Sequence, residues 1–381
     1  MDKRFRSLLY ALLLWIVPTA VLAEGHGGTK QRKTVAVVLS GGGAKGMAHI
    51  GALKVIERAG IPVDIVTGTS MGSIVGGMYA LGYSADQLDS IVRKQDWSFV
   101  ITDREDLSQQ SLAERRKQNM YVLSTGLTIG KRNKDDGGLI KGKNLDVLFQ
   151  QLCAGYTDSL DFTKDLPRAF ACVATDLLKN EEIDFYSGYL PQAMRASMAI
   201  PAVFSPVRIG DKVLVDGGLR NNFPADIAQA LEADIIIGVS VPDAKKTADD
   251  LNSTMDILSQ LIDTNFENKV EKNMKLTDVA VIVNTKGYSA ASFNKTAIDT
   301  LIHRGEEETL KHWDELMALK RKIGIDEGYI PQPPHARRVR EVGRRQRVTG
   351  YEFVNMTPWD ERFLRRKFHL RDPRRERTAT R

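Results

Sequence analysis

The sequence predicts an α/β fold with a mainly parallel central sheet. From Thr34 onward, short apolar runs alternate with amphipathic stretches, which is the pattern of parallel strands joined by crossover helices. The first run, Thr34–Ser40, is uninterrupted and rich in β-branched residues, so it suits a central strand covered on both faces. Hydrophobic residues make up 42% of the 381 positions, which is ordinary for a globular protein with a substantial core.

The first elements are expected in the order strand, helix, strand, helix. Thr34–Ser40 leads into a glycine loop, and Ala44–Arg58 then has helical periodicity and ends before Gly60. A short strand is expected over Val63–Thr67, followed by a turn and a helix of small residues over Met71–Leu81.

The later part of the chain repeats this alternation. Further strands are expected at Arg168–Thr175, Lys212–Val215, Asp234–Val241 and Asp278–Asn284. Helices are expected at Pro224–Glu232, Leu251–Lys269 and Ser292–Leu319. The polar, Gln-rich stretch Lys94–Asp136 has little periodicity and is a candidate lid or insertion.

The N-terminus predicts export. Residues 1–23 combine a basic start, an apolar stretch and a small residue at Ala23, which indicates a secretory signal peptide. A single membrane anchor is the alternative, and Pro18 near the cleavage position favours the signal peptide. We therefore expect the mature protein in the periplasm, at the outer membrane or secreted.

The main domain is expected over residues 24–327, with a linker over 328–345 and a basic tail over 346–381. Paired prolines in Gly328–Pro334 end the last helix and favour an extended linker. From Ala336 to the end, fifteen Arg and Lys stand against six Asp and Glu, a net charge of +9, which leaves −3 on everything before. The overall charge of +6 thus describes the tail and does not predict a nucleic-acid partner for the main domain.

The two cysteines, Cys153 and Cys172, are expected to be buried thiols. An oxidising compartment would permit a disulfide between them. Their spacing in the sequence does not show that their Cβ atoms meet.

The segment Gly68–Gly72 (GTSMG) fits G-x-S-x-G and lies between a predicted strand and a predicted helix. Such a turn exposes the serine hydroxyl, and glycines such as Gly68 and Gly72 let the backbone turn without a Cβ clash. The N-terminus of the helix adds partial positive charge where negative charge develops. Ser70 is therefore the candidate nucleophile, and an ordinary helix-capping serine is the alternative.

The glycine loop Gly41–Gly46 (GGGAKG) opens the first helix. Successive glycines there can direct several N–H groups at one anion, either the oxyanion of a tetrahedral intermediate or a nucleotide phosphate. The loop lacks the Walker pattern but fits G-x-G-x-x-G, so a nucleotide-binding domain is a real alternative. The oxyanion interpretation is preferred because it also gives Ser70 a role.

The base for Ser70 is predicted to be Asp216. It follows the strand Lys212–Val215 and so emerges at the carboxyl end of a strand, where open α/β sheets place their sites. A second Asp-Gly-Gly at Asp136 lies in a polar stretch and is interpreted as a turn. An α/β-hydrolase triad with a histidine base remains open, with His303 or His312 as candidates.

Three ordered motifs resemble those of the patatin-like phospholipases: Gly41–Gly46, Gly68–Gly72 and Asp216–Gly218. The stretches Arg195–Phe204 (RASMAIPAVF) and Asn221–Pro224 (NNFP) add to the resemblance, which covers roughly residues 33–319. It implies a three-layer α/β/α fold, no metal, no cofactor, and hydrolysis of acyl esters in phospholipids or other lipids, with contact to a membrane surface. It predicts no nucleic-acid partner and no particular oligomeric state.

The resemblance also implies roles for single residues in a Ser–Asp dyad without histidine. Ser70 is the nucleophile and Asp216 the base, and the motif-supporting glycines are Gly46, Gly68, Gly72, Gly217 and Gly218. The N–H groups of the oxyanion hole are assigned to Gly41, Gly42 and Gly43. Lys45 matches the loop's usual basic position, and His49 matches a position that is commonly His in the family.

The C-terminal tail departs from this pattern. It resembles the start of the POTRA-like module that follows the hydrolase in secreted bacterial members, but no barrel sequence follows. A truncated module, contact with anionic lipid, and a merely solvated tail are the alternatives.

Overall fold

The computed structural model describes residues 32–104, 138–156, 160–242, 257, 269–325, 329, 331 and 357–367. The chain forms two units, Met1–Ala336 and Arg337–Arg381. In the second unit the structure describes helix α13 (Pro358–Lys367). The predicted signal peptide 1–23, the body of the candidate lid and most of the predicted linker lie outside the described residues, so the predicted domain limits stay a prediction.

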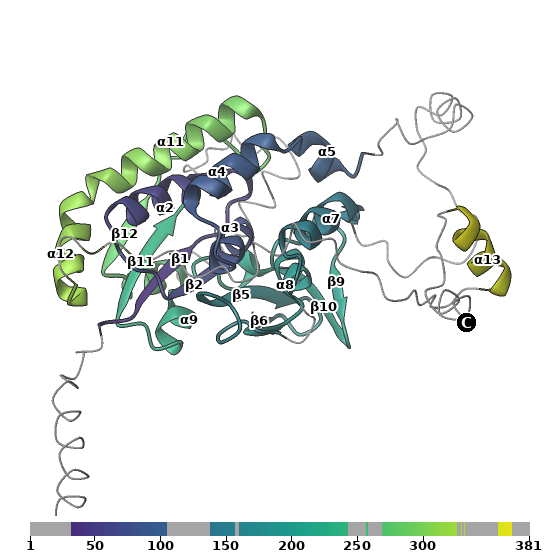
Figure 1. The fold of residues 1–381 in the computed structure, drawn as a ribbon, viewed down its shortest axis with the longest axis horizontal. Helices are drawn as coiled ribbons and strands as arrows, with labels where there is room; N and C mark the ends of the chain where they lie inside the picture. The colour runs from purple at the N-terminus through teal and green to yellow at the C-terminus, as the bar shows by residue number, and fades with distance from the viewer. Residues whose placement is uncertain are drawn as a thin grey trace, which may run out of the picture. The chain divides into compact units, whose positions relative to one another are not determined.

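The first unit is built on an eight-stranded sheet (Figure 1). Five neighbouring strands are parallel, and three more extend the sheet in antiparallel pairings. The parallel strands are, in spatial order, β12 (Val279–Ile282), β11 (Ile235–Ser240), β1 (Val35–Leu39), β2 (Ile65–Thr69) and β5 (Ala169–Asp176). The antiparallel strands are β10 (Lys212–Asp216) and β6 (Glu181–Phe185), both paired with β5, and β9 (Val207–Ile209), paired with β10. The predicted α/β class with a mainly parallel central sheet is confirmed.

Strand β5 pairs with both β2 and β10, the strands that lead to Ser70 and Asp216. Strand β2 pairs with it as far as Thr69 opposite Val173, and β10 pairs with it as far as Asp216 opposite Ala174. Strand β6 pairs with residues 172–176 of β5 and therefore occupies the other side of that strand. Each side of a strand holds one neighbour, so β2 and β10 share one side of β5 and approach each other end to end.

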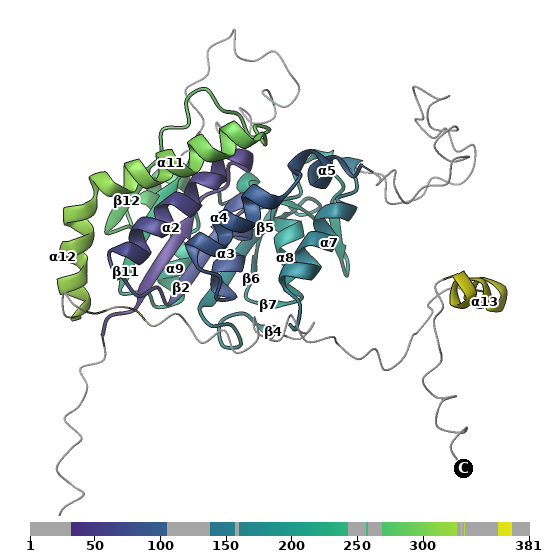
Figure 2. The ribbon, with the colours of Figure 1, turned by 45° about the horizontal axis from the view of Figure 1, so that its top comes forward.

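Helices cover both faces of the sheet (Figures 1 and 2). On one face lie α2 (Ala48–Arg58), α3 (Met71–Ala80), α4 (Ala85–Lys94) and α11 (Lys295–Lys311). On the other lies α9 (Ala225–Ala230), where Ala225 and Ala228 pack with Phe223 against the strand residues Ala36, Val38, Ile65 and Ile236. Burial of such side chains contributes roughly 25 cal/mol for each Å² of apolar surface removed from water.

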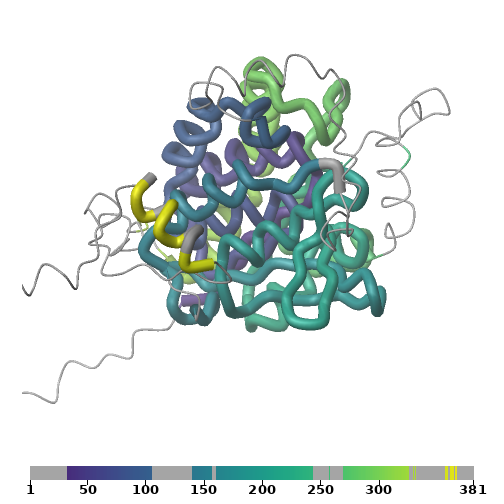
Figure 3. The backbone as a smooth tube through the Cα atoms, turned by 90° about the vertical axis from the view of Figure 1, so that its right-hand side faces the viewer, coloured from purple at the N-terminus to yellow at the C-terminus, as the bar shows by residue number. Residues whose placement is uncertain are grey.

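Helices α2 and α11 touch through their backbones. A Cβ added at Gly51 would lie 1.9 Å from the Ile302 carbonyl oxygen, and one at Gly305 would lie 1.9 Å from that of Ala48. Figure 3 shows the green C-terminal helices against the purple and blue N-terminal segments, although they are far apart in the sequence. This close packing fixes the position of α2, which the glycine loop directly precedes.

Shorter elements complete the unit. The helices are η1 (Gly43–Met47), α5 (Trp97–Thr102), α7 (Lys143–Leu152), α8 (Leu190–Ser197), η3 (Gly217–Leu219) and α12 (Trp313–Ile323). Two small sheets pair β3 (Gly138–Ile140) with β8 (Ala202–Phe204) and β4 (Leu160–Asp161) with β7 (Ser187–Gly188).

Two predicted helices were wrong in detail. The predicted helix Ser292–Leu319 is divided into α11 and α12, because His312 leaves helical geometry (ψ 16°) and its N–H bonds to Thr309, three residues back. The predicted helix Ala44–Arg58 begins as the 3₁₀ turn η1 before α2 starts. Most of predicted helix Leu251–Lys269 lies outside the described residues.

Cys153 and Cys172 are free and buried, as predicted. Burial raises the pKa of the Cys153 thiol to about 12. In the part of the chain that the structure describes, no helix is long and apolar enough to cross a membrane.

Candidate active site

Ser70 lies on a sharp turn directly between β2 and α3. Its backbone has φ 53° and ψ −121°, a conformation that non-glycine residues rarely adopt. The predicted strand Val63–Thr67 in fact ends two residues later, at Thr69, so no loop separates the strand from Ser70. This geometry is the strained strand-to-helix turn that the motif predicted.

The glycines of the turn are required by close backbone packing. A Cβ at Gly68 would lie 2.4 Å from the carbonyl oxygen of Gly72, and a Cβ at Gly72 would lie 2.2 Å from that of Leu39. Any side chain at Gly72 would therefore push the turn away from β1. Both positions support Ser70 by allowing α3 to start against the sheet.

The Ser70 hydroxyl donates a hydrogen bond to Asp216, with 2.6 Å between Oγ and Oδ2. The two residues are 146 positions apart in the sequence, and their side chains meet because β2 and β10 end opposite neighbouring residues of β5. Ser70 is 5% exposed and Asp216 is 4% exposed. Burial raises the pKa of Asp216 to about 6, against the opposing effects of the hydrogen bonds from Ser70 and from the Gly218 N–H.

Asp216 is held at both its carboxylate and its backbone. Oδ1 accepts the Gly218 N–H at 2.7 Å, and the Asp216 carbonyl accepts the Thr175 hydroxyl at 3.0 Å. A Cβ at Gly217 would lie 2.2 Å from the Val173 carbonyl oxygen. Gly217 thus allows the chain to pass tightly over β5, and Gly218 orients the carboxylate toward Ser70.

The glycine loop is fixed at its two ends. The Gly41 N–H donates to the Asn222 carbonyl at 3.1 Å, and the Ala44 N–H donates to the Ala290 carbonyl at 2.8 Å. Among the described residues, no protein acceptor is found for the N–H groups of Gly42 and Gly43 between them. A Cβ at Gly41 would lie 3.2 Å from the Ser70 Cβ, so the loop passes directly beside Ser70. Of the three predicted oxyanion donors, Gly42 and Gly43 are therefore favoured over Gly41.

Three residues after the first glycines, Lys45, Gly46 and His49, are buried or closely packed. Lys45 is buried in η1, and a Cβ at Gly46 would lie 2.4 Å from the Met71 side chain, so Gly46 allows the loop to pack on α3. His49 is fully buried and donates from Nε2 to the Ser40 carbonyl at 2.8 Å. Burial lowers its pKa to about 4, so the ring is neutral at ordinary pH and holds the end of β1.

The alternatives raised by the sequence receive no support from the geometry. His303 faces Glu307 at 3.2 Å and His312 faces Glu315 at 3.1 Å, both on the outer helices. Strand β2, which follows the helix after the glycine loop, ends at Thr69 and is followed by Ser70, where a dinucleotide-binding fold would need an acid. Asp136 lies outside the described residues. Among the residues that are described, no cluster of His, Cys, Asp or Glu is arranged to hold a metal.

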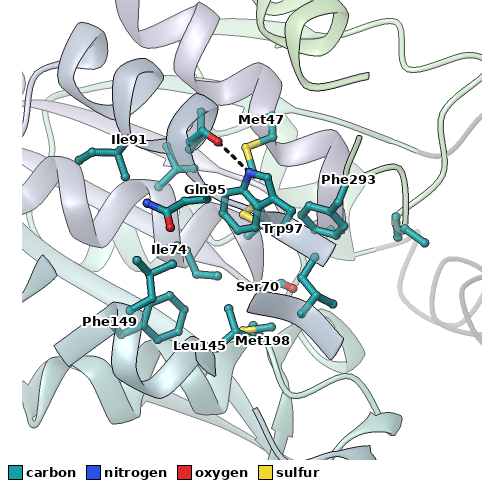
Figure 4. A pocket seen from close by; sticks show the side chains of 18 of the residues that line it. Met47, Ser70, Ile74, Ile91, Gln95, Trp97, Leu145, Phe149, Met198 and Phe293 are labelled. Carbon is teal, nitrogen blue, oxygen red and sulfur yellow. Dashed lines mark hydrogen bonds between the residues drawn. The ribbon is translucent and has the colours of Figure 1, made fainter. Parts of the chain in front are cut away.

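A cavity of about 490 Å³ opens beside Ser70 (Figure 4). Its wall is largely apolar and comes from α3, α4, α5 and α7 together with the segments 198–204 and 290–294. Trp97 and Phe293 contact each other in its wall with ring centroids 5.5 Å apart, and the Trp97 indole N–H donates to the Val92 carbonyl at 2.8 Å. Ser70 thus lies at the wall of a chamber suited to a hydrocarbon chain.

Sequence reasoning missed two residues that fix the site. The Ser197 hydroxyl accepts the Ser70 N–H at 2.9 Å and so holds the strained turn. A Cβ at Gly41 would lie 2.3 Å from the Asn222 Oδ1, which places Asn222 against the glycine loop. Both lie within the stretches RASMAIPAVF and NNFP, so a signal was present, but only the fold shows their contacts.

A family model described as "Patatin-like phospholipase" matches residues 37–229, about half of the chain. The chain belongs to the patatin-like phospholipase family. The matched range contains the turn Gly68–Gly72 around Ser70, which we call the elbow, together with the glycine loop and Asp216.

Among curated proteins, patatin-like phospholipase domain-containing protein 6 of the mouse is 32% identical over 228 residues. The alignment covers 59% of this chain and 15% of the mouse protein. An uncharacterized NTE family protein of Mycobacterium bovis is 30% identical over 224 residues, which is 59% of this chain and 52% of that protein. The chain thus spans about half the length of the mycobacterial relative and 15% of the mouse protein.

Solved structures with a similar fold are more distant. The crystal structure of VipD from Legionella pneumophila is 16% identical, with a TM-score of 0.41, and the match covers 74% of this chain and 67% of that chain. Human GIVD cytosolic phospholipase A2 is 12% identical, with a TM-score of 0.37 and coverage of 77% and 59%.

Proposed function

We propose that this chain is a lipid acyl hydrolase in which Ser70 and Asp216 act as a catalytic dyad. The family to which it belongs consists of lipid-hydrolysing esterases, and that membership supports the reaction class. The single observation that supports the dyad is the 2.6 Å hydrogen bond between the Ser70 hydroxyl and a buried carboxylate at the wall of an apolar cavity. The proposal concerns this chain, which spans only part of its larger relatives.

The reaction would proceed through an acyl-enzyme. Asp216 accepts the hydroxyl proton as Ser70 Oγ attacks the acyl carbonyl carbon, and the N–H groups of Gly42 and Gly43 bind the oxyanion. The tetrahedral intermediate collapses, and Asp216 returns the proton to the leaving alcohol. Water then attacks the acyl-enzyme with Asp216 again as base, which releases the fatty acid and restores the Ser70 hydroxyl.

The environment of Asp216 suits it to this role. A carboxyl with a pKa near 6 is a stronger base than an ordinary aspartate and is still ionised at neutral pH. The 2.6 Å contact positions it to take the proton directly, so no histidine is needed between the two side chains. The buried, neutral His49 supports β1 and the glycine loop and does not transfer protons in this mechanism.

The cavity supports a lipid substrate with a long acyl chain. Each methylene that moves from water into the apolar chamber contributes roughly 0.8 kcal/mol. A phospholipid or another lipid ester at a membrane surface is therefore the proposed substrate. Export through a signal peptide over residues 1–23 and a basic, lipid-facing tail over 346–381 belong to the same proposal.

Turnover of a chromogenic acyl ester tests the dyad. We expect Ser70→Ala and Asp216→Asn each to lower kcat by at least about 10³-fold, since residues that act as one unit fail together. A fluorophosphonate probe should label wild type at Ser70 and should not label Ser70→Ala. Matched controls are Ser90→Ala on the exposed side of α4 and Asp211→Asn in the exposed turn before β10, which should both behave as wild type. Full turnover by Ser70→Ala, or labelling at another serine, would contradict the proposal.

A further inference from the structure

The segment 284–294 connects β12 to α11 and rests against the glycine loop. Its Ala290 carbonyl accepts the Ala44 N–H at 2.8 Å, and a Cβ added at Gly43 would lie 2.5 Å from the same oxygen. Ala290, Ala291, Phe293 and Asn294 also line the cavity beside Ser70. The segment is thus a wall of the chamber and a direct neighbour of the proposed oxyanion hole.

The glycine loop needs such a neighbour. Glycine adopts conformations on both sides of the Ramachandran map at little energetic difference, so the peptide planes of three successive glycines can rotate easily. Gly43 has φ 55°, in the left-handed region. The bond to Asn222 fixes the first peptide of the loop and the bond to Ala290 fixes the last. The Gly41 carbonyl also accepts the Ser40 hydroxyl at 3.1 Å, and the Gly42 carbonyl accepts the Lys45 N–H at 3.2 Å. The bond to Ala290 completes this set of bonds, which together hold the direction of the Gly42 and Gly43 N–H groups.

Arg304 on α11 holds the segment 284–294 in place. Its Nη1 donates to the carbonyl of Asn284 at 3.1 Å and to that of Lys286 at 2.8 Å. The guanidinium carbon also lies 5.0 Å from the centroid of the Tyr288 ring, within the range of a cation–π interaction. One side chain therefore joins three points of the segment just before it reaches Ala290.

The helix that carries Arg304 is itself fixed to the glycine loop. Helix α11 packs backbone to backbone on α2 at Gly51 and Gly305, and α2 continues directly from η1. Arg304 thus sets the position of Ala290 relative to the same helix pair from which the glycine loop emerges. At the start of the segment the Thr285 hydroxyl donates to the Pro242 carbonyl at 2.5 Å, so both ends of this part of the chain are tied down.

We infer that Arg304 is a positioning residue of the oxyanion hole, which acts through Ala290 on the N–H groups of Gly42 and Gly43. The inference rests on the proposed acyl transfer, because the oxyanion exists only in that reaction. Arg304 does not line the cavity, so its removal should weaken binding of the transition state and leave binding of the acyl chain unchanged.

The test compares Arg304→Met with Arg58→Met in kinetics on the acyl ester. Removing one donor of an oxyanion hole lowers kcat by about 10²–10³-fold, and a loosened loop should produce a smaller loss, about tenfold, with KM within about twofold of wild type. Arg58 forms an exposed ion pair with Glu306 on the same two helices, at the end of α2 away from the glycine loop, so Arg58→Met should retain wild-type kcat. Arg304→Lys should recover part of the lost rate.

A transition-state analogue separates positioning from general damage. An alkyl trifluoromethyl ketone adds to a catalytic serine as a hemiketal oxyanion, so its inhibition constant should rise in Arg304→Met by the factor by which kcat/KM falls. Tyr288→Phe, which keeps the ring, should match wild type, and Tyr288→Ala should show a smaller loss than Arg304→Met. If Arg304→Met does not fold, the kcat values of Arg304→Lys and Tyr288→Ala are compared with that of Arg58→Met instead.

The outcomes distinguish this inference from the proposed function. Equal kcat values for Arg304→Met and Arg58→Met, with Ser70→Ala inactive, would overturn the role of Arg304 and leave the dyad in place. A rise in KM at constant kcat would also overturn it, because it would assign Arg304 to substrate binding. Full activity of Ser70→Ala would remove the dyad itself.

Discussion

The parallel half of the sheet and its antiparallel extension supply the two partners of the proposed dyad in different ways. Strand β2 belongs to the parallel half and delivers Ser70 on a turn into a helix, whereas β10 belongs to the extension and runs toward β2 from the opposite direction. The strands end opposite Val173 and Ala174, which are consecutive residues of β5. The site thus lies where two strand ends meet on one side of a shared neighbour.

The two halves also constrain their residues by different forces. The turn at Ser70 is confined chiefly by steric contacts, since the glycines beside it leave no space for a side chain, and the Ser197 hydroxyl accepts its N–H. Asp216 is held by electrostatics and hydrogen bonds, since its carboxylate is buried and accepts from Ser70 and from Gly218. Added side-chain volume beside Ser70 should therefore destabilise the fold and abolish activity. Removal of the charge at Asp216 should instead change the pH dependence of stability.

The largest effect is expected from volume added at the elbow. In Gly72→Ala the new Cβ would meet the Leu39 carbonyl at 2.2 Å, so α3 must move away from β1. We expect a loss of more than about 3 kcal/mol in unfolding free energy and a loss of activity. Urea denaturation measures the first and ester turnover the second.

The control is Gly210→Ala in the turn between β9 and β10. Gly210 has φ 61° but no atom within 4 Å of an added Cβ, so only backbone strain opposes the change. That strain should amount to roughly 1 kcal/mol, with activity retained. Similar losses in both variants would show that the elbow is not sterically special.

Removal of the charge at Asp216 should stabilise the fold, whereas Gly72→Ala destabilises it. The pKa of Asp216 is about 6 in the folded protein against a usual 3.8, so the folded state binds protons more tightly between pH 4 and 6. Stability therefore falls as the pH rises through this window, and above it the ionised carboxylate destabilises the fold by about 3 kcal/mol. Asp216→Asn removes this penalty and should be more stable than wild type at pH 8 while it is inactive.

Urea denaturation at pH 8 and pH 4 tests this sign. The advantage of Asp216→Asn should be largest at pH 8 and should vanish near pH 4, where the wild-type carboxyl is protonated as well. Asp211→Asn, in an exposed turn, should show no such difference. A wild-type protein that is as stable as Asp216→Asn at pH 8 would contradict a destabilising buried charge.

The sequence was most informative about residues whose role depends on their position at the end of a strand. Ser70 lies three residues after a short apolar run and Asp216 directly after one, so their place at a strand end could be predicted from local pattern alone. Local pattern could not predict that the strands carrying these residues share one side of β5, because this depends on β10 running antiparallel. In addition, β6 and β9 were not expected as strands. The shared site therefore rested on the family resemblance until the fold was known.

The glycine loop shows a second kind of limit. Its composition predicts an anion-binding nest, but not which N–H groups are already used. The bonds of Gly41 to Asn222 and of Ala44 to Ala290 join the loop to segments far away in the sequence. Local pattern predicts a set of possible donors, and the tertiary contacts leave Gly42 and Gly43 as the donors that we propose.

The smallest expected effect concerns Ser197, which joins the two halves at the elbow. Its hydroxyl accepts the Ser70 N–H at 2.9 Å from the end of α8, the helix that packs against both β5 and β10. Ser197→Ala leaves that buried N–H without its acceptor, which should cost about 1 kcal/mol of unfolding free energy and lower kcat by about tenfold as the turn relaxes. Ser197→Thr keeps the acceptor and should recover kcat if its methyl group fits. Because the Asp216 carboxylate accepts its hydrogen bonds from Ser70 and Gly218 and none from Ser197, the pH dependence of stability should match wild type in both variants. A changed pH dependence would show instead that Ser197 acts on Asp216, and the elbow would then be supported from the base side as well.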